Sequence, residues 1–371
     1  MRRMDVNRRS SPGQPDRTEP PGPPDARRRR SATPAEQRRR VVTWAQQNGV
    51  LFALLAMCAY FASQSDRFLT RGNINIILLQ VAVTGIIAVP AAMLILAGYV
   101  DLSVGSVMVL SAIAFGQVIE GGGSELVAVI VALAVGATWG LTSGFFISYL
   151  GFSPIVVTLG GLAAARGIAQ VWSEAITVSG FSDTFGELGI GRWFDTPIPI
   201  FLTGGVFLLG FYAWNQSTTG RHLAAIGSDE VAARAVGIRT KRMPMIVYGL
   251  SGLAAAIGGL IVTSQLDGAS MSIGQGEELT VLTAVLLGGV SFKGGRGSLM
   301  GVLSGLLFLG ALRNGLILLG VGTFWQQVAI GAALFFAAAL DVLYQRLERL
   351  ALEKAVDDDE STDLTGVTDD D

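Results

Sequence analysis

Long apolar stretches, separated by short polar or glycine-containing segments, follow one another along most of the chain. Ten such blocks occur, near residues 49–64, 74–97, 100–119, 125–150, 153–172, 198–214, 244–266, 278–292, 297–318 and 323–344. A helix needs roughly 20 apolar residues to cross a hydrocarbon core about 30 Å thick. Several blocks reach that length, so the pattern predicts an all-α polytopic membrane protein with about ten transmembrane helices.

Two regions, 74–119 and 278–318, are hard to divide into separate helices because glycine and polar residues interrupt them. Irregular backbone at membrane depth is tolerated where protein covers it or where it lines a cavity. We therefore expect some broken helices, lining a cavity, in both regions.

The composition agrees with a membrane location. Of 371 residues, 50% are hydrophobic and only 15% are charged, whereas a soluble domain carries about 25% charged residues. The 48 glycines exceed the usual share of roughly 7%, and small residues let transmembrane helices approach closely. A single cysteine, Cys58, and a single histidine, His222, exclude a disulfide framework and a metal site with several Cys or His ligands.

Composition divides the chain into three parts. Residues 1–41 are rich in Arg and Pro, and we expect a disordered cytoplasmic tail because so few apolar residues cannot offset the entropy of ordering. An Arg-rich run also suits nucleic acid, but without interleaved aromatic residues we favour contact with anionic membrane lipid and expect no nucleic-acid partner. Residues 42–345 form the transmembrane domain, and 346–371 an acidic cytoplasmic tail.

The charged residues between the apolar blocks predict an orientation. Basic residues gather in the loop 215–243 and the turn 291–298, namely Arg221, Arg234, Arg239, Lys241, Arg242, Lys293 and Arg296. The loops on the other side are rich in acids: Glu120, Glu125, Glu174, Asp183, Glu187, Asp195, Asp267, Glu277 and Glu278. Because Lys and Arg are enriched in cytoplasmic loops, we expect both termini and the loop 215–243 inside the cell.

The chain offers little for catalysis. It contains no Gly-x-x-x-x-Gly-Lys-[Ser/Thr] phosphate-binding loop, so we do not expect it to hydrolyse ATP by that route. His222 lies in the charged loop, away from any apolar pocket, which gives no support to a Ser/His/Asp nucleophile. We expect no enzyme activity, no catalytic residue, no metal and no cofactor on this chain.

Four ionisable residues fall inside apolar blocks: Asp101, Arg166, Arg313 and Asp341. A charge at the bilayer centre costs roughly 2.5–3.5 kcal/mol on insertion scales. Asp341 is near the end of the last block, where snorkelling explains it, and Arg313 suits either an aqueous pathway or the interface. For Arg166 we favour a role in packing or cavity polarity. Asp101 either caps a helix start with Ser103 or takes part in a pathway.

Within the loop 215–243, residues 228–237 predict a short helix. Ser228 suits the N-cap, Asp229 and Glu230 the first turn, and Gly237 the position after the helix. So short a helix is marginal in water and needs something to pack against. Its small apolar side chains form a stripe: Val231, Ala232, Ala235 and Val236. This stripe suits a groove on another protein. The alternative is that it packs on the membrane surface or on this protein's own loops.

This loop resembles the coupling loop of ABC importer membrane subunits, here Glu230-Val231-Ala232-Ala233-Arg234-Ala235-Val236-Gly237-Ile238. Four stretches extend the resemblance to permease subunits of ribose-type monosaccharide importers: GYVDLSVGSVMVLSA (98–112), GFSPIVVTLGGLAAARGIA (151–169), TTGRHLAAIGSDEVAARAVGI (218–238) and LLGGVSFKGGRGSLMGVLSGLLFLGALRNGLILLGVGTFWQQVAIG (286–331). In order and spacing they cover residues 67–343 almost continuously. Tyr99 and Val231 depart from residues common in that family.

The resemblance implies a permease that imports a ribose-like pentose or hexose, moved by a cytoplasmic ABC ATPase subunit that binds ATP and Mg²⁺. It also implies a second permease copy, identical or different, and an extracytoplasmic sugar-binding protein. The implied ATPase-coupling residues are Gly227, Ser228, Asp229, Glu230, Ala232, Ala233 and Gly237. From resemblance and polarity, we expect these residues near the translocation pathway: Asp101, Ser103, Arg166, Asn314, Trp325, Gln326 and Gln327.

Two other interpretations are open. A secondary transporter driven by protons or ions needs titratable groups at mid-membrane, and from the sequence only Asp101 is a candidate. A membrane scaffold that recruits a cytoplasmic partner through the loop needs no transport at all.

Overall fold

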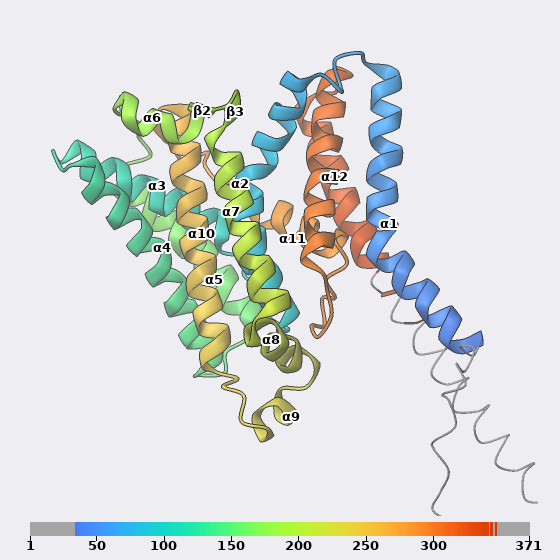
Figure 1. Ribbon diagram of the computed structural model, residues 1–371. Helices are drawn as coiled ribbons and strands as arrows, with labels where there is room; N and C mark the ends of the chain where they lie inside the picture. The colour runs from blue at the N-terminus through green and yellow to red at the C-terminus, as the bar shows by residue number, and fades with distance from the viewer. Residues whose placement is uncertain (1–33, 341, 344–345, 347–371) are drawn as a thin grey trace, which may run out of the picture.

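The computed structural model describes residues 34–340, 342, 343 and 346, with side chains from residue 49 onward. Its long helices lie side by side as a bundle (Figure 1). The labelled helices are α1 (Pro34–Gln64), α2 (Arg71–Leu96), α3 (Val104–Glu120), α4 (Glu125–Ser148), α5 (Pro154–Trp172), α6 (Asp183–Ile190), α7 (Ile198–Phe211), the π-helical turn η1 (Tyr212–Gln216), α8 (Thr218–Ser228), α9 (Glu230–Ala235), α10 (Arg242–Leu266), α11 (Glu277–Leu287) and α12 (Leu299–Leu318). A further helix, Thr323–Leu340, follows α12.

The bundle has two distinct ends (Figure 1). We call the end that carries α8 and α9 the α9 end, and the opposite one the α6 end. Short strands pair antiparallel, β1 (Val178–Ser179) with β4 (Gly268–Ala269) and β2 (Arg192–Trp193) with β3 (Thr196–Pro197). The β2–β3 hairpin lies beside α6, so the two ends differ in kind as well as position.

Seven helices of the described chain are long and apolar enough to cross a membrane: α2, α4, α5, α7 with η1, α10, α12 and Thr323–Leu340. Two shorter apolar helices are Gly49–Gln64, within α1, and α3. Helix α11 has 11 residues, about 16 Å at 1.5 Å per residue, which is too short to cross about 30 Å. The all-α polytopic fold is confirmed, and the expectation of about ten full spans is met only in part.

Glycines allow α4 and α10 to pack with their backbones in contact. Gly136, Gly140 and Gly144 recur every four residues and so share one face of α4. A β-carbon at any of them would lie less than 3.0 Å from a backbone atom of α10. The adjoining Tyr248 of α10 is fully buried. The abundance of glycine thus produces close helix packing, as the composition predicts.

The two regions that are hard to divide in the sequence are where helices break. Helix α2 ends at Leu96 and α3 starts at Val104, while α11 ends at Leu287 and α12 starts at Leu299. Gly98 and Gly289, with φ of 82° and 80°, stop the first helix of each pair, because positive φ is accessible to glycine at little cost. Each break is followed by the N-terminus of a new helix, that of α3 after the first break and that of α12 after the second.

The ends of the chain bear on the predicted tails. Helix α1 begins at Pro34, and proline is well tolerated in the first turn of a helix. Residues 34–41, which we expect in the disordered tail, are therefore helical. Residues 1–33 and 347–371 are outside the described residues, so the rest of both predicted tails stays a prediction.

Candidate functional site

The short helix predicted within 228–237 is present as α9, preceded by a second short helix, α8, but the prediction that Ser228 is its N-cap is wrong. Ser228 ends α8, and its hydroxyl donates to the carbonyl oxygen of Ala224 at 2.9 Å. Asp229 is the N-cap of α9, where Oδ1 accepts the backbone N–H groups of Val231 and Ala232 at 2.8 and 2.9 Å. A charged carboxylate is the stronger acceptor, which explains why Asp229 and not Ser228 occupies the cap.

The other end of α9 matches the prediction. Gly237 has a φ of 85°, and its N–H bonds to the carbonyl oxygen of Arg234 at 3.0 Å. The N–H of Ile238 bonds to the carbonyl oxygen of Ala233 at 3.1 Å, which closes the helix in the manner of a Schellman motif. Glu230 and Arg234, one turn apart, form an ion pair. Helix α9 is therefore well terminated despite its length of 6 residues.

Helix α9 exposes its apolar stripe. Val231 is 80% and Val236 77% exposed, and Ala232 and Ala235 between them are exposed as well. Ala233 points inward and is buried. Within the described chain the stripe therefore has no cover from this protein's own loops, which disfavours the alternative that it packs on them.

Backbone contacts between glycines join three segments at the α9 end. We call these residues the glycine junction: Gly98, Gly227, Gly294 and Gly295. A β-carbon at Gly227 would overlap the carbonyl oxygen of Leu96 and the backbone nitrogen of Gly295. The N–H of Gly295 also donates to the carbonyl oxygen of Leu96 at 2.8 Å. The end of α8 therefore contacts the end of α2 and the turn after α11 directly, with no side chain between them.

Tyr99 provides a second link between this loop and the α2–α3 break. The pKa of Tyr99 is raised to about 12, mainly by burial and also by the negative charge of Glu230, while the guanidinium of Arg234 acts in the opposite direction. The phenol thus stays neutral at physiological pH and lies within electrostatic range of α9. Its ring packs edge to face on Tyr248 of α10, with centroids 6.3 Å apart.

Asp101 fixes the α2–α3 break to α10. Its carboxylate accepts the backbone N–H of Ser103 at 3.0 Å, the hydroxyl of Ser103 at 2.7 Å and the hydroxyl of Ser251 at 2.8 Å. Tyr248 donates its hydroxyl to the carbonyl oxygen of Val100 at 2.9 Å. Asp101 accepts a backbone N–H as the capping interpretation expects, but Ser103 and not Asp101 is the N-cap residue of α3.

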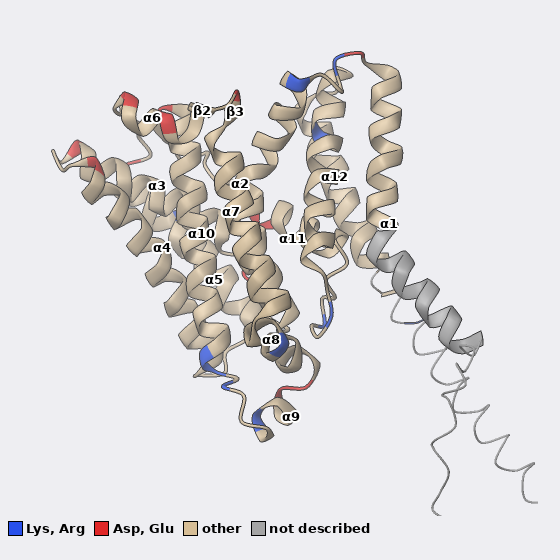
Figure 2. Cartoon of the chain, viewed as in Figure 1, with Lys and Arg blue, Asp and Glu red and all other residues tan. Residues whose placement is uncertain are grey.

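Polar side chains from five helices form a group of neighbours between the two ends of the bundle. We call them the mid-bundle cluster: Thr84, Ser106, Arg166, Glu277, Glu278 and Arg313. Thr84 lies at the middle of the 26-residue helix α2 and donates its hydroxyl to Glu277. Figure 2 shows acidic residues beside α11, between the two ends of the bundle. The cluster therefore lies between the two ends of the bundle and not in either set of end loops.

Burial disfavours the charged forms of Glu277 and Glu278, and two arginines of the cluster offset part of that cost. The guanidinium of Arg313 stabilises the charge of Glu277, and that of Arg166 stabilises the charge of Glu278. Both carboxylates are in the first turn of α11, where the helix dipole favours acids. Arg166 also donates to Ser106 Oγ at 3.4 Å and to the carbonyl oxygen of Met271 at 3.2 Å. This position agrees with the role in packing and internal polarity that we expect for Arg166.

The assignment of Glu277 and Glu278 to an outer loop is wrong. The sequence holds one signal for their true place, since two acids follow Gly274 and Gly276 and precede an apolar run, which is typical of a helix start. The depth of that helix start depends on how far residues 267–276 enter the bundle. Gly274 packs its backbone against Gly105 of α3, a contact that no local pattern reveals.

The other residues predicted for the pathway do not converge on one site. Asn314 is buried and exchanges two amide hydrogen bonds with Asn73 of α2, at 2.8 and 3.0 Å. Gln326 is buried and donates to the carbonyl oxygen of Val321 at 2.9 Å. Trp325 and Gln327 are exposed in the first turn of the last helix. Asp341 is outside the described residues.

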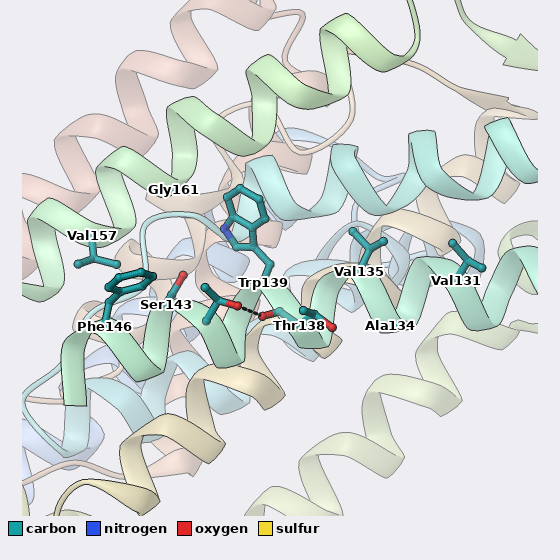
Figure 3. A pocket seen from close by; sticks show the side chains of 10 residues that line it. Val131, Ala134, Val135, Thr138, Trp139, Ser143, Phe146, Val157 and Gly161 are labelled. Atoms are coloured by element: carbon teal, nitrogen blue, oxygen red, sulfur yellow. Dashed lines mark hydrogen bonds between the residues drawn. The ribbon is translucent and has the colours of Figure 1, made fainter. Parts of the chain in front are cut away.

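An apolar groove of about 660 Å³ runs between α4 and α5 (Figure 3). Its lining includes Val131, Val135, Phe146 and Val157, with the indole ring of Trp139 at its centre. The hydroxyl of Thr142 donates a hydrogen bond to the carbonyl oxygen of Thr138 at 2.7 Å. Such a lining suits lipid chains better than a hydroxyl-rich solute. Within the described residues, no three His, Cys, Asp or Glu side chains are grouped as metal ligands.

Known proteins are similar in sequence to this chain over most of its length. A family model described as "Branched-chain amino acid transport system / permease component" matches residues 73–338. The ribose import permease protein RbsC of Escherichia coli K12 is 36% identical over 302 residues, which is 80% of this chain and 94% of RbsC. RbsC of Bacillus subtilis 168 is 34% identical over 298 residues, 80% of this chain and 92% of that protein.

A relative named for another sugar has similar identity. The L-arabinose transport system permease protein AraH of Escherichia coli K12 is 34% identical over 301 residues, 81% of this chain and 91% of AraH. No solved structure matches the chain. The matched residues run from the start of α2 into the last helix and include the α8–α9 loop, both helix breaks and the mid-bundle cluster. The chain is thus a multi-pass membrane protein that belongs to the branched-chain amino acid transport system / permease component family.

Proposed function

We propose that this chain is the permease subunit of an ATP-binding cassette importer and passes a monosaccharide, a ribose-like pentose or a hexose, into the cell. Relatives named for ribose, arabinose and allose support the choice of a sugar. The single observation that carries the proposal is the exposed apolar stripe of α9, held on the glycine junction. An exposed stripe needs a partner, and the junction connects that partner to the helices.

The α9 end faces the cytoplasm in this proposal, with both termini inside. Figure 2 shows Lys and Arg on α8, α9 and the start of α10, whereas acidic residues gather about α6 and the start of α4. Cytoplasmic loops carry the excess of positive charge. The orientation puts the stripe of α9 within reach of a cytoplasmic ATPase subunit.

That ATPase subunit binds ATP and Mg²⁺ and receives α9 in a groove. Val231, Ala232 and Val236 present a small apolar surface, and small side chains let the helix sit close to the groove floor. Gly237 fixes where α9 ends, and Asp229 fixes where it begins. No cofactor on this chain is needed for the movement.

Motion of α8 and α9 reaches the transmembrane helices through the glycine junction. Because Gly227 contacts Leu96 and Gly295 backbone to backbone, a shift of α8 displaces the ends of α2 and of the α11–α12 turn together. These two segments flank the two helix breaks, which makes them suited to open and close a passage. A second permease copy, identical or different, completes the passage, and an extracytoplasmic sugar-binding protein delivers the sugar.

The substitution Ala232→Glu tests the proposal, because it places a charge in the centre of the stripe. We expect the ATPase subunit no longer to co-purify and sugar uptake to fall to background, with normal membrane insertion. Ala232→Ser at the same position is the matched control and retains both. Uptake by Ala232→Glu at the level of Ala232→Ser would refute docking through α9.

The mid-bundle cluster favours a second candidate, an ion- or proton-coupled secondary transporter. Such a transporter needs titratable groups at membrane depth, and Glu277 and Glu278 supply them in addition to Asp101. A protonophore separates the two candidates. Uptake that depends on the ATPase and survives the protonophore supports the importer, and uptake that collapses without any ATPase supports the secondary transporter.

A further inference from the structure

A basic pocket of about 430 Å³ lies at the α9 end, between the end of α4 and the start of α10. It is lined by Tyr149, Arg234, Ile238, Arg239, Thr240, Lys241 and Arg242. None of the residues of the proposed docking stripe lines this pocket. The pocket therefore needs its own explanation.

The positive charge of the pocket is not balanced within the described chain. Arg234 pairs with Glu230 and donates to Thr240 Oγ1 at 3.3 Å. Across the residues that the structure describes, no carboxylate pairs with Arg239, Lys241 or Arg242, which are all exposed. Three like charges on neighbouring residues repel one another, so an anion placed among them is stabilised.

The start of α10 adds the positive end of a helix dipole to this charge. Lys241 is the N-cap residue, and no side chain caps the helix. Arg242 is the first residue of α10 and Pro244, two residues later, has no N–H to donate. The N–H of Met243 already bonds to the carbonyl oxygen of Arg239 at 3.2 Å, so the 25-residue helix contributes mainly the positive end of its dipole, which favours an anion such as a phosphate group.

The surface next to the pocket is apolar, which points to the source of that phosphate. Leu150 and Phe152 after α4, and Ile246 and Leu250 on α10, are 50%, 53%, 43% and 46% exposed. Ile246 and Leu250 are one turn apart and so lie in line along α10, away from its start. Lys241 lies over the ring of Tyr149 at 5.9 Å from its centroid, as cations and aromatic rings do at membrane interfaces.

We propose that this pocket binds the headgroup of one anionic phospholipid. The phosphate contacts the side chains of Arg239, Lys241 and Arg242 beside the start of α10, and an acyl chain follows Ile246 and Leu250. Because residues 238–241 connect α9 to α10, the bound lipid fixes the position of α9 relative to the membrane. The site depends on its own residues and holds whether or not α9 docks on an ATPase.

Lipid titration of the full chain, purified with the subunits that accompany it, tests the site. Native mass spectrometry counts bound phosphatidylglycerol, with phosphatidylcholine and inorganic phosphate as parallel probes. The variant Lys241→Gln/Arg242→Gln removes two charges from the pocket, and Arg221→Gln/Arg346→Gln removes two exposed charges elsewhere. We expect one phosphatidylglycerol per chain, bound about tenfold or more weakly by the pocket variant and unchanged in the control.

Each other outcome overturns the proposal. Equal weakening in both variants would mean attraction by net charge alone, and equal binding of inorganic phosphate would mean a site for free anions. Loss of an accompanying protein from the pocket variant, with lipid binding intact, would assign the pocket to that protein. Binding of phosphatidylglycerol by the unmodified complex should also weaken as salt is raised, and salt-independent binding would contradict a headgroup held by charge.

Discussion

The α8–α9 loop exposes apolar side chains, whereas the mid-bundle cluster holds two half-buried carboxylates, Glu277 and Glu278, between helices. Folding alone favours the reverse in both places, since large apolar groups gain by burial and charges lose by it. Within the cluster, the positive charges of Arg166 and Arg313 offset part of the cost of burying Glu278 and Glu277. The stripe of α9 has no such partner in the described chain. The difference indicates that the loop is made for another protein and that the cluster holds the bundle together.

This comparison separates two kinds of variant. Changes in the loop should reduce transport and leave the stability of the isolated chain nearly intact. Changes in the cluster should reduce stability before they alter transport.

The largest effect is expected for Gly227→Ala in the glycine junction. A methyl group there overlaps Leu96 and Gly295, and overpacking of this kind costs about 1–3 kcal/mol. If roughly 1.4 kcal/mol of that falls on the coupled movement, uptake slows about tenfold while ATP hydrolysis continues. Uptake and ATP hydrolysis in reconstituted vesicles measure both. Gly204→Ala, on α7 with no atom within 4 Å of a new β-carbon, is the control, and equal uptake by the two variants would exclude transmission through the junction.

The next effect is expected for Glu277→Leu in the mid-bundle cluster. Leucine cannot accept the hydroxyl of the buried Thr84, and a buried donor without its partner costs about 1–3 kcal/mol. Unfolding in detergent should show a lower free energy of unfolding by roughly this amount, against little change for Glu120→Leu, an exposed acid. A stable Glu277→Leu protein that does not transport would contradict a structural role and favour ion coupling.

A smaller effect is expected for Asp101→Asn. Asparagine keeps an oxygen for the N–H of Ser103 and loses the charge that accepts the hydroxyl of Ser251. One hydrogen bond contributes about 0.5–1.5 kcal/mol, so uptake should fall no more than about tenfold. Uptake rate per assembled complex is the measurement. Complete loss of uptake with normal assembly would give Asp101 a direct part in the pathway.

The smallest effect is expected for Gly237→Ala at the end of α9. With φ at 85°, an alanine costs about 1 kcal/mol, which should loosen α9 and leave the bundle intact. Hydrogen exchange of the α9 amides should quicken about fivefold, with exchange in α10 unaltered. The control is Gly167→Ala, at an exposed position on α5. Equal exchange rates of the α9 amides in the two variants would show that position 237 does not require glycine.

The sequence predicts what depends on neighbouring residues. Apolar blocks locate the helices, interruptions by glycine and polar residues mark the two regions where helices break, and Gly237 marks the end of α9. It is less reliable where two local signals compete, as at Ser228 and Asp229, because either side chain suits an N-cap.

Contacts between distant segments are beyond such patterns. The depth of Glu277 depends on a chain segment that enters the bundle and on Thr84, which is 193 residues away. Asn314 is polar and near a glycine, as a pathway residue would be, yet its amide is taken up by Asn73, 241 residues away. The glycine junction likewise needs three segments brought together.

Uptake of labelled ribose, arabinose and allose into vesicles tests the central claim most directly, with this chain reconstituted alone or together with its ATPase and sugar-binding protein. We predict accumulation of at least one sugar above its outside concentration only with all components and ATP present. Accumulation of any of them by the chain alone would contradict the account.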